Sequence, residues 1–124
     1  MKHTTVWIDH QRAYIIECTT TGIQDRSIEK EEKGKMDHEH LKRFYHKVAM
    51  SLANPDQLLI LGPGTAKNEF KHHCEQHGHA DLKNAIVGIE TMKDHPSKSE
   101  MIEVSRKFFN QYFTWHVTEA ENLN

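Results

Sequence analysis

The sequence predicts a single α/β domain with a mixed five-stranded sheet and the element order β-β-β-α-β-α-β-α. Three observations support this prediction. Two β-rich runs lie close together near the N-terminus, four consecutive large aliphatic residues (58–61) precede a Gly-Pro-Gly break, and three later segments carry apolar residues at helical spacing. Helices that alternate with strands indicate parallel strands joined by right-handed crossovers.

The first three strands are expected to form an antiparallel meander. The runs Thr4–His10 and Arg12–Cys18 are separated by a single residue, which is typical of a tight hairpin. A Thr-rich turn ending at Gly22 leads into Ile23–Ile28, whose thinner and partly charged pattern suits an edge strand. The charged segment Lys30–Lys35 contains no apolar residue, so we expect a mobile, replaceable loop.

A helix is predicted from Asp37, a suitable N-cap, to about residue 52. Its buried face is formed by residues at three-and-four spacing: Leu41, Phe44, Tyr45, Val48, Ala49 and Leu52. Asn54-Pro55 ends this helix. The strand 57–62 follows, and its unbroken aliphatic run is typical of a strand buried on both faces.

The second half of the chain is expected to contain two more helices and one more strand. Thr65 is the expected cap of a helix that runs to about Gly78. The segment 84–91 predicts a second buried strand. Ser97 and Glu100 form the pattern of a capping box, and the last helix carries an inner stripe of Met101, Val104, Phe108 and Tyr112.

This element order is that of the ribonuclease H-like three-layer architecture, in which the first strand is central and the expected sheet order is 3-2-1-4-5. We expect one domain over residues 1–117, followed by a polar tail at 118–124. Phe113, Trp115 and Val117 alternate with other residues near this tail. One core has limited room for them, so we expect either a homodimer contact through 108–117 or a cover over the sheet edge.

Composition narrows the function classes. The chain has 124 residues, 36% hydrophobic and 27% charged residues, and a formal charge of −2, so net charge alone does not predict strong binding to a phosphate backbone. No signal-peptide pattern opens the sequence. Cys18 and Cys74 are far apart and form no Cys-x-x-Cys motif, which favours free thiols in a reducing compartment. We therefore expect a cytoplasmic protein.

The turn after the aliphatic strand is the first candidate site. Gly62, Pro63 and Gly64 precede the expected helix, whose first turns hold Thr65 and Lys67, and such a turn can present backbone N–H groups to an anion. The stretch contains neither Gly-x-Gly-x-x-Gly nor a Walker pattern. A sharp chain reversal is therefore favoured over a nucleotide cradle. If Gly64 needs a positive φ, replacing it should destabilise the fold.

The eleven histidines are the compositional oddity, and they are densest at residues 72–79. On a helix, His73 and His77 stand four residues apart, a spacing that can hold a metal. No second ligand pair of the usual spacing accompanies them, so a structural role is favoured. We expect no metal and no other cofactor, and we keep His73 and His77 as weak metal candidates.

A metal-dependent nuclease is the alternative function. Such an enzyme of this architecture needs several carboxylates around two Mg²⁺ ions, and Asp9 on the first strand fits one position. The strand 57–62 offers no acid, and Glu39, Glu90 and Asp94 do not complete a set. Asp9 is better explained as a hairpin residue that hydrogen-bonds its own backbone. A non-catalytic role is therefore favoured over a diverged nuclease around Asp9.

The stretch 58–70, a strand followed by Gly-Pro-Gly-x-x-Lys-x-x-Phe, resembles the central domain of Pelota and of the class 1 peptide-release factors of eukaryotes and archaea. The opening 6–13 resembles the first hairpin of that family. The segments 89–91 and 94–96 are similar to the last strand and helix entry of small bacterial relatives called translational machinery proteins. The resemblance covers nearly the whole chain and implies the ribonuclease H-like fold.

The resemblance also implies a function in translation. In release factors the loop after the third strand carries Gly-Gly-Gln, which acts in peptide release, whereas here the loop 30–37 lacks it. Peptide release is therefore not expected. The implied function is a ribosome-associated, RNA-binding module without catalysis, which contacts the ribosome, a tRNA or a translation factor. The expected binding residues are Gly62, Pro63, Gly64, Thr65 and Lys67 in the turn, with Lys33 and Lys35 in the loop.

Overall fold

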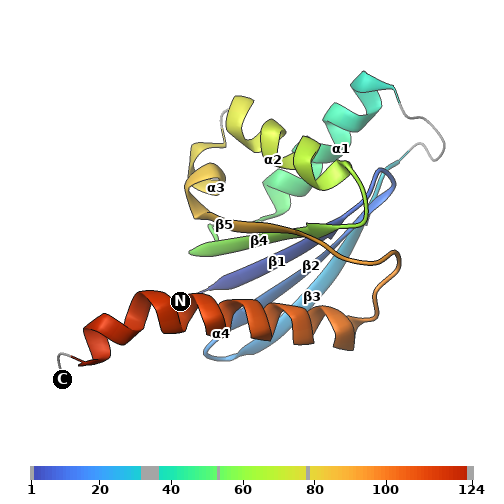
Figure 1. Cartoon of the computed structure of the whole chain (residues 1–124). Coiled ribbons are helices and arrows are strands. Elements are labelled where there is room, and N and C mark those ends of the chain that lie inside the picture. The colour runs from blue at the N-terminus through green and yellow to red at the C-terminus, as the bar shows by residue number, and fades with distance from the viewer. Residues whose placement is uncertain (1, 32–36, 53, 78, 123–124) are drawn as a thin grey trace.

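The computed structural model describes residues 2–31, 37–52, 54–77 and 79–122, and it forms three layers around one sheet (Figure 1). The sheet order is β3-β2-β1-β4-β5, as predicted. One helix covers one face of the sheet and three cover the other. The elements are β1 (His3–Ile8), β2 (Arg12–Thr19), β3 (Gly22–Glu29), α1 (His38–Ser51), β4 (Gln57–Gly62), α2 (Ala66–Gln76), α3 (Ala80–Ala85), β5 (Ile86–Thr91) and α4 (Lys98–Asn122).

The central strand β1 has two different neighbours. It pairs antiparallel with β2, placing Trp7 opposite Tyr14, and parallel with β4, placing Val6 opposite Ile60. The parallel pair requires the long connection through β2, β3 and α1. The predicted meander and the mixed sheet are therefore confirmed.

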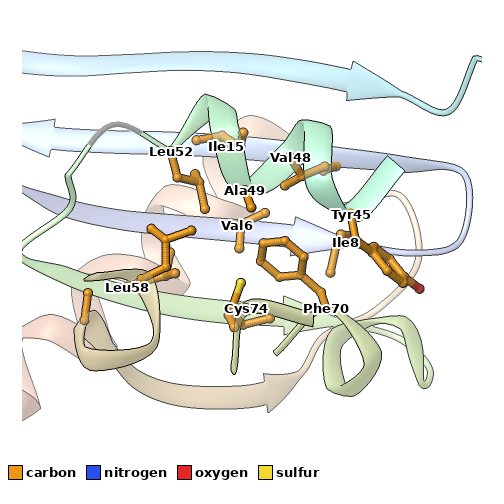
Figure 2. Packing of buried hydrophobic residues seen from close by; sticks show 14 of the residues in the cluster. Val6, Ile8, Ile15, Tyr45, Val48, Ala49, Leu52, Leu58, Phe70 and Cys74 are labelled. Atoms are coloured by element: carbon orange, nitrogen blue, oxygen red, sulfur yellow. The ribbon is translucent and has the colours of Figure 1, made fainter. Parts of the chain in front are cut away.

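Alternating side chains of the strands build two cores, one on each face of the sheet. Figure 2 shows the larger core, in which side chains from β1, β2 and β4 pack against α1 and α2. The expected inner face of α1 is confirmed. The labelled members of this core are Val6, Ile8, Ile15, Tyr45, Val48, Ala49, Leu52, Leu58, Phe70 and Cys74.

The second core lies between the sheet and α4. Trp7, Leu59 and Leu61 pack there with Met101 and Phe109. One hydrogen bond joins α4 to the sheet, and another joins the sheet to the segment before α4. The hydroxyl of Ser105 donates to Thr5 Oγ1 at 2.7 Å. The indole N–H of Trp7 donates to the carbonyl of Lys93 at 3.0 Å. Burial of these groups is therefore compensated by hydrogen bonds.

Two of the three predicted helix starts have the expected caps. The Asp37 carboxylate accepts from the backbone N–H of His40 at 2.9 Å. Ser97 and Glu100 form the reciprocal capping box, since the N–H of Glu100 donates to Ser97 Oγ at 3.1 Å and the N–H of Ser97 donates to Glu100 Oε1 at 2.9 Å.

The region between α2 and β5 differs from the prediction. A short helix, α3, forms where no helix was predicted and takes in the first two residues of the predicted strand 84–91, so β5 starts only at Ile86. Leu82 and Ala85 of α3 are buried in the larger core, because the helical conformation directs both apolar side chains toward it. The prediction of a second buried strand is also wrong, because β5 is a half-buried edge strand.

The C-terminal segment is helical. α4 continues through residue 117 to Asn122, where the sequence pattern had suggested an alternating tail. Since neither proline nor glycine follows Pro96, nothing in the sequence interrupts the helix. Although α4 spans 25 residues, no described helix combines the length and apolar character needed to cross a membrane. The domain division at residue 117 stays a prediction.

The start of the charged loop is anchored, contrary to the expectation for Lys30–Lys35. Lys30 is only 3% exposed, and its backbone N–H donates to the carbonyl of Gln11 at 2.7 Å. Glu31 forms an ion pair with Lys47 of α1 at 3.5 Å. The aliphatic stem of a lysine can be buried, which the charge pattern did not reveal. Lys33 and Lys35 lie outside the described residues.

We predict that Gly62→Ala destabilises the fold by about 1–3 kcal/mol, whereas Gly64→Ala changes stability by less than about 0.5 kcal/mol. A Cβ at Gly62 would clash with the backbone carbonyl oxygen of Ile8, but a Cβ at Gly64 would meet no atom within 4 Å. Urea denaturation of both variants tests this. Equal midpoints would contradict the close approach of β1 and β4.

Candidate functional site

The predicted binding turn, residues 62–67, lies at the carboxyl end of β4. Gly62 is buried against the end of β1, and its carbonyl accepts from the N–H of Met92 at 3.0 Å. After Gly62 the chain reaches the protein surface, where Gly64 and Thr65 are exposed. The turn therefore projects from the central pair of parallel strands, the position at which open α/β sheets commonly bind ligands.

Two details of the turn differ from the sequence expectation, and Lys67 makes a contact that the sequence did not indicate. Among the described glycines, positive φ occurs at Gly22 and not at Gly64. The hydroxyl of Thr65 makes no cap hydrogen bond and instead donates to Glu69 Oε2 at 3.0 Å. Lys67 is half-buried, and its ammonium group donates to the carbonyl of Gly64. The lysine charge is thus held on the turn itself.

Glu69 connects the turn to two other elements. Its carboxylate accepts from the hydroxyl of Tyr45 in α1 at 2.8 Å and from Thr65 at 3.0 Å. His10 Nε2, from the β1–β2 hairpin, lies 3.3 Å from both carboxylate oxygens. The sequence did not indicate this role of Glu69, because two of its partners, Tyr45 and His10, are distant in the chain. The network fixes the turn relative to the hairpin and α1.

The network perturbs two acid groups. Partial burial alone would raise the pKa of Glu69, but hydrogen bonds from Tyr45, His10 and Thr65 outweigh it and lower the pKa below its ordinary value. Burial, together with the neighbouring Glu69 carboxylate, raises the pKa of Tyr45. At neutral pH the pair is therefore a phenol donating to a carboxylate, a charge-assisted hydrogen bond.

Asp9 has the structural role expected of a hairpin residue. Its Oδ1 accepts from the backbone N–H groups of Gln11 and Arg12, both at 2.8 Å. The other acids considered for a nuclease are spread over α1, β5 and the segment before α4: Glu39, Glu90 and Asp94. Within the described ranges, the converging ligand groups include no carboxylate set around Asp9.

A histidine cluster lies where α1, the last turn of α2 and the start of α3 meet, at the end of α2 opposite the turn. One imidazole nitrogen from each of His46, His73 and His79 falls within 4.8 Å of the others. The ring of the predicted partner His77 lies near that of His73, with centroids 4.6 Å apart and planes tilted by 31°, but its nitrogens are not in this group. The sequence did not indicate His46, which is 27 positions from His73 and lies on another helix.

Comparison with known proteins confirms the resemblance predicted from the sequence. The Pelota homologue of Methanocaldococcus jannaschii is 34% identical over 93 residues, which cover 69% of this chain and 26% of the relative. The chain thus spans about a quarter of the length of the curated relative that it matches. No family model matches the sequence.

Solved structures show the same fold. Archaeoglobus fulgidus Pelota matches 97% of this chain with a TM-score of 0.68 and 17% identity, over 35% of its own chain. The archaeal translation termination factor aRF1 matches 99% of this chain, with a TM-score of 0.61, 14% identity and 42% of its length covered. An archaeal Pelota described bound to the ribosome with ABCE1 matches 97% of this chain, with a TM-score of 0.56, 19% identity and 38% coverage. The fold of this chain is therefore Pelota-like.

We predict that ionised Glu69 stabilises the fold above its ordinary pKa of 4.5 and that this contribution is lost as pH falls through the lower pKa of the folded state. The Glu69→Gln variant should therefore be less stable than the wild type at pH 7. On acidification to about pH 3, its stability should fall by less than that of the wild type. Urea midpoints at the two pH values measure this.

The matched control for this prediction is Glu75→Gln, on the same helix, where the carboxylate contacts Lys71 instead. Its acid dependence should stay close to that of the wild type. If Glu69→Gln and Glu75→Gln behave alike at both pH values, the Glu69 network does not stabilise the turn.

Proposed function

We propose that this chain is a translation-associated binding module that contacts the ribosome, a tRNA or a translation factor and performs no catalysis itself. The observation that supports this most strongly is the Pelota-like fold over nearly the whole chain, combined with 34% sequence identity to a Pelota homologue. One of the similar structures is described as ribosome-bound. We place the contact surface at residues 62–67 and the loop 30–37.

The geometry favours a common surface for these two segments. The N–H of Lys30, where the loop begins, donates to Gln11 in the β1–β2 hairpin. Asp9 and His10 precede Gln11 in the same hairpin, and His10 contacts Glu69 of α2. The hairpin therefore joins the loop entry to the turn, and all three lie at the same end of the sheet (Figure 1).

The turn is suited to binding because it is exposed but held in one conformation. The bonds of Glu69 to α1 and the hairpin limit the motion of the turn before any partner arrives. A prearranged surface loses less conformational entropy on binding. Lys67 supplies a positive charge beside the exposed Gly64 and Thr65, which suits the phosphate groups of ribosomal RNA.

Peptide release is not part of the proposal. The loop 30–37 contains no Gly-Gly-Gln, and the acids considered for a nuclease do not converge in the described residues. Self-association through 108–117 is a separate proposal. Phe108 and Phe109 already pack toward the sheet in the smaller core, so a homodimer contact would use residues farther along α4.

We predict that Lys67→Ala weakens co-sedimentation with ribosomes, since it removes the positive charge beside the exposed turn, while stability changes by only about 0.5 kcal/mol. The affinity of the wild type should fall as salt rises, and the variant should show a smaller salt dependence. Pelleting assays at two salt concentrations measure both quantities.

The matched control for ribosome binding is Lys107→Ala, an exposed lysine on α4, which covers the opposite face of the sheet. Lys107→Ala changes the net charge by the same amount as Lys67→Ala, but it should leave ribosome binding unaltered. Equal binding by the wild type and both variants would remove the turn 62–67 from the contact surface. Equal weakening by both variants would indicate a nonspecific charge effect.

A further inference from the structure

Three helical elements bring histidines to one point on the side of the sheet that carries the larger core. His46 comes from the second half of α1, His73 from the last turn of α2, and His79 from the residue just before α3. Their ring centroids are close together: 6.3 Å for His46–His73, 5.4 Å for His46–His79 and 5.5 Å for His73–His79. Their segments are fixed by core residues such as Phe70 and Leu82.

His73 is placed unusually for a polar residue. The residue is only 5% exposed, and its Nε2 atom is buried without a hydrogen-bond partner. Nε2 of His79 is also buried without such a partner. A neutral imidazole has one N–H donor and one acceptor nitrogen, so either tautomer leaves a buried group unsatisfied. Such burial costs free energy unless something binds there.

The electrostatics favour the neutral, ligand-competent ring. Burial and the neighbouring histidines lower the pKa of His73 to about 4, and burial also lowers the pKa of His79. At neutral pH these rings therefore keep a free lone pair. Protonation does not satisfy the cluster, because it would place charge among other histidines and near Lys42.

We propose that His46, His73 and His79 bind a divalent transition-metal ion of the Zn²⁺ type. Imidazole nitrogen is a preferred ligand of Zn²⁺, and three histidines leave a fourth position for water or for a group of a partner. Zn–N bonds of about 2.0–2.1 Å in tetrahedral geometry put ligand nitrogens about 3.3 Å apart. The three nitrogens lie within 4.8 Å of one another, so binding draws them slightly together.

Small side-chain movements suffice for this. His46 is exposed and His79 is half-buried, so both rings have room to turn toward the buried His73. The ion would tie α1 to α2 and to the connection before α3, and it would satisfy the buried nitrogens. This site is separate from the turn 62–67 and does not depend on the proposed binding function.

The test is a titration of the full chain, freed of metal by a chelator, with Zn²⁺ in a calorimeter and with Co²⁺ followed by visible absorption. The wild type should bind one ion per chain, and Co²⁺ should give the strong absorption of a four-coordinate site. His46→Ala and His79→Ala should each weaken binding by at least about tenfold. Both replace histidines at or near the surface, so the folded state should persist, which circular dichroism checks.

Two further histidines provide matched controls. His72 is exposed and adjacent to His73 on α2, and His72→Ala should bind Zn²⁺ within about twofold of the wild type. His77→Ala should also retain binding, because its nitrogens are not in the converging group. Uniform binding by all variants, or a stoichiometry other than one, would show only adventitious binding by surface histidines and overturn the proposal. Loss in His77→Ala with retention in His79→Ala would overturn the assignment of the three ligands.

Discussion

The close contact between β1 and β4 is the constraint on which the rest of the structure depends. The two strands run parallel at the centre of the sheet, and both are buried on both faces over most of their length. Where they end, the missing side chain of Gly62 lets the β4 backbone pass the Ile8 carbonyl. The chain can therefore turn immediately into α2, and this places the exposed turn beside the β1–β2 hairpin.

Polar contacts then determine how that end of the sheet is organised. The Asp9 carboxylate closes the hairpin by bonding the backbone, and Glu69 connects the hairpin to α1 and to the turn. The Asp9 bonds are local, whereas the bonds of Glu69 to Tyr45 and His10 join groups that the packing of the elements brings together. Packing therefore sets the position of the elements, and a few side-chain hydrogen bonds fix the surface that we propose for binding.

Much of the fold could be predicted from the sequence, because periodicity and capping are local properties. The aliphatic run 58–61, the cap at Asp37 and the capping box at Ser97 identified their elements correctly. Predictions failed where distant contacts decide the outcome. Thr65 bonds Glu69, whose carboxylate is also held by the distant Tyr45 and His10, instead of capping α2. Lys30 is buried against the hairpin.

The candidate sites show the same division. The turn 62–67 was visible as a motif, but the network that holds it was not, since Tyr45 and His10 are far from Glu69 in sequence. His73 was identified from spacing on one helix, and its partners came from α1 and α3 because tertiary packing brings those helices together. A spacing rule finds ligands on one element and misses those that the fold assembles.

Hydrogen exchange of the chain with and without purified ribosomes tests the binding account most directly, because it reports both whether and where binding occurs. We expect slower exchange of the backbone amides between Gly62 and Lys67 on addition of ribosomes, with little change along the exposed face of α4. Unchanged exchange throughout the chain, or protection confined to α4, would contradict the proposed function and its surface.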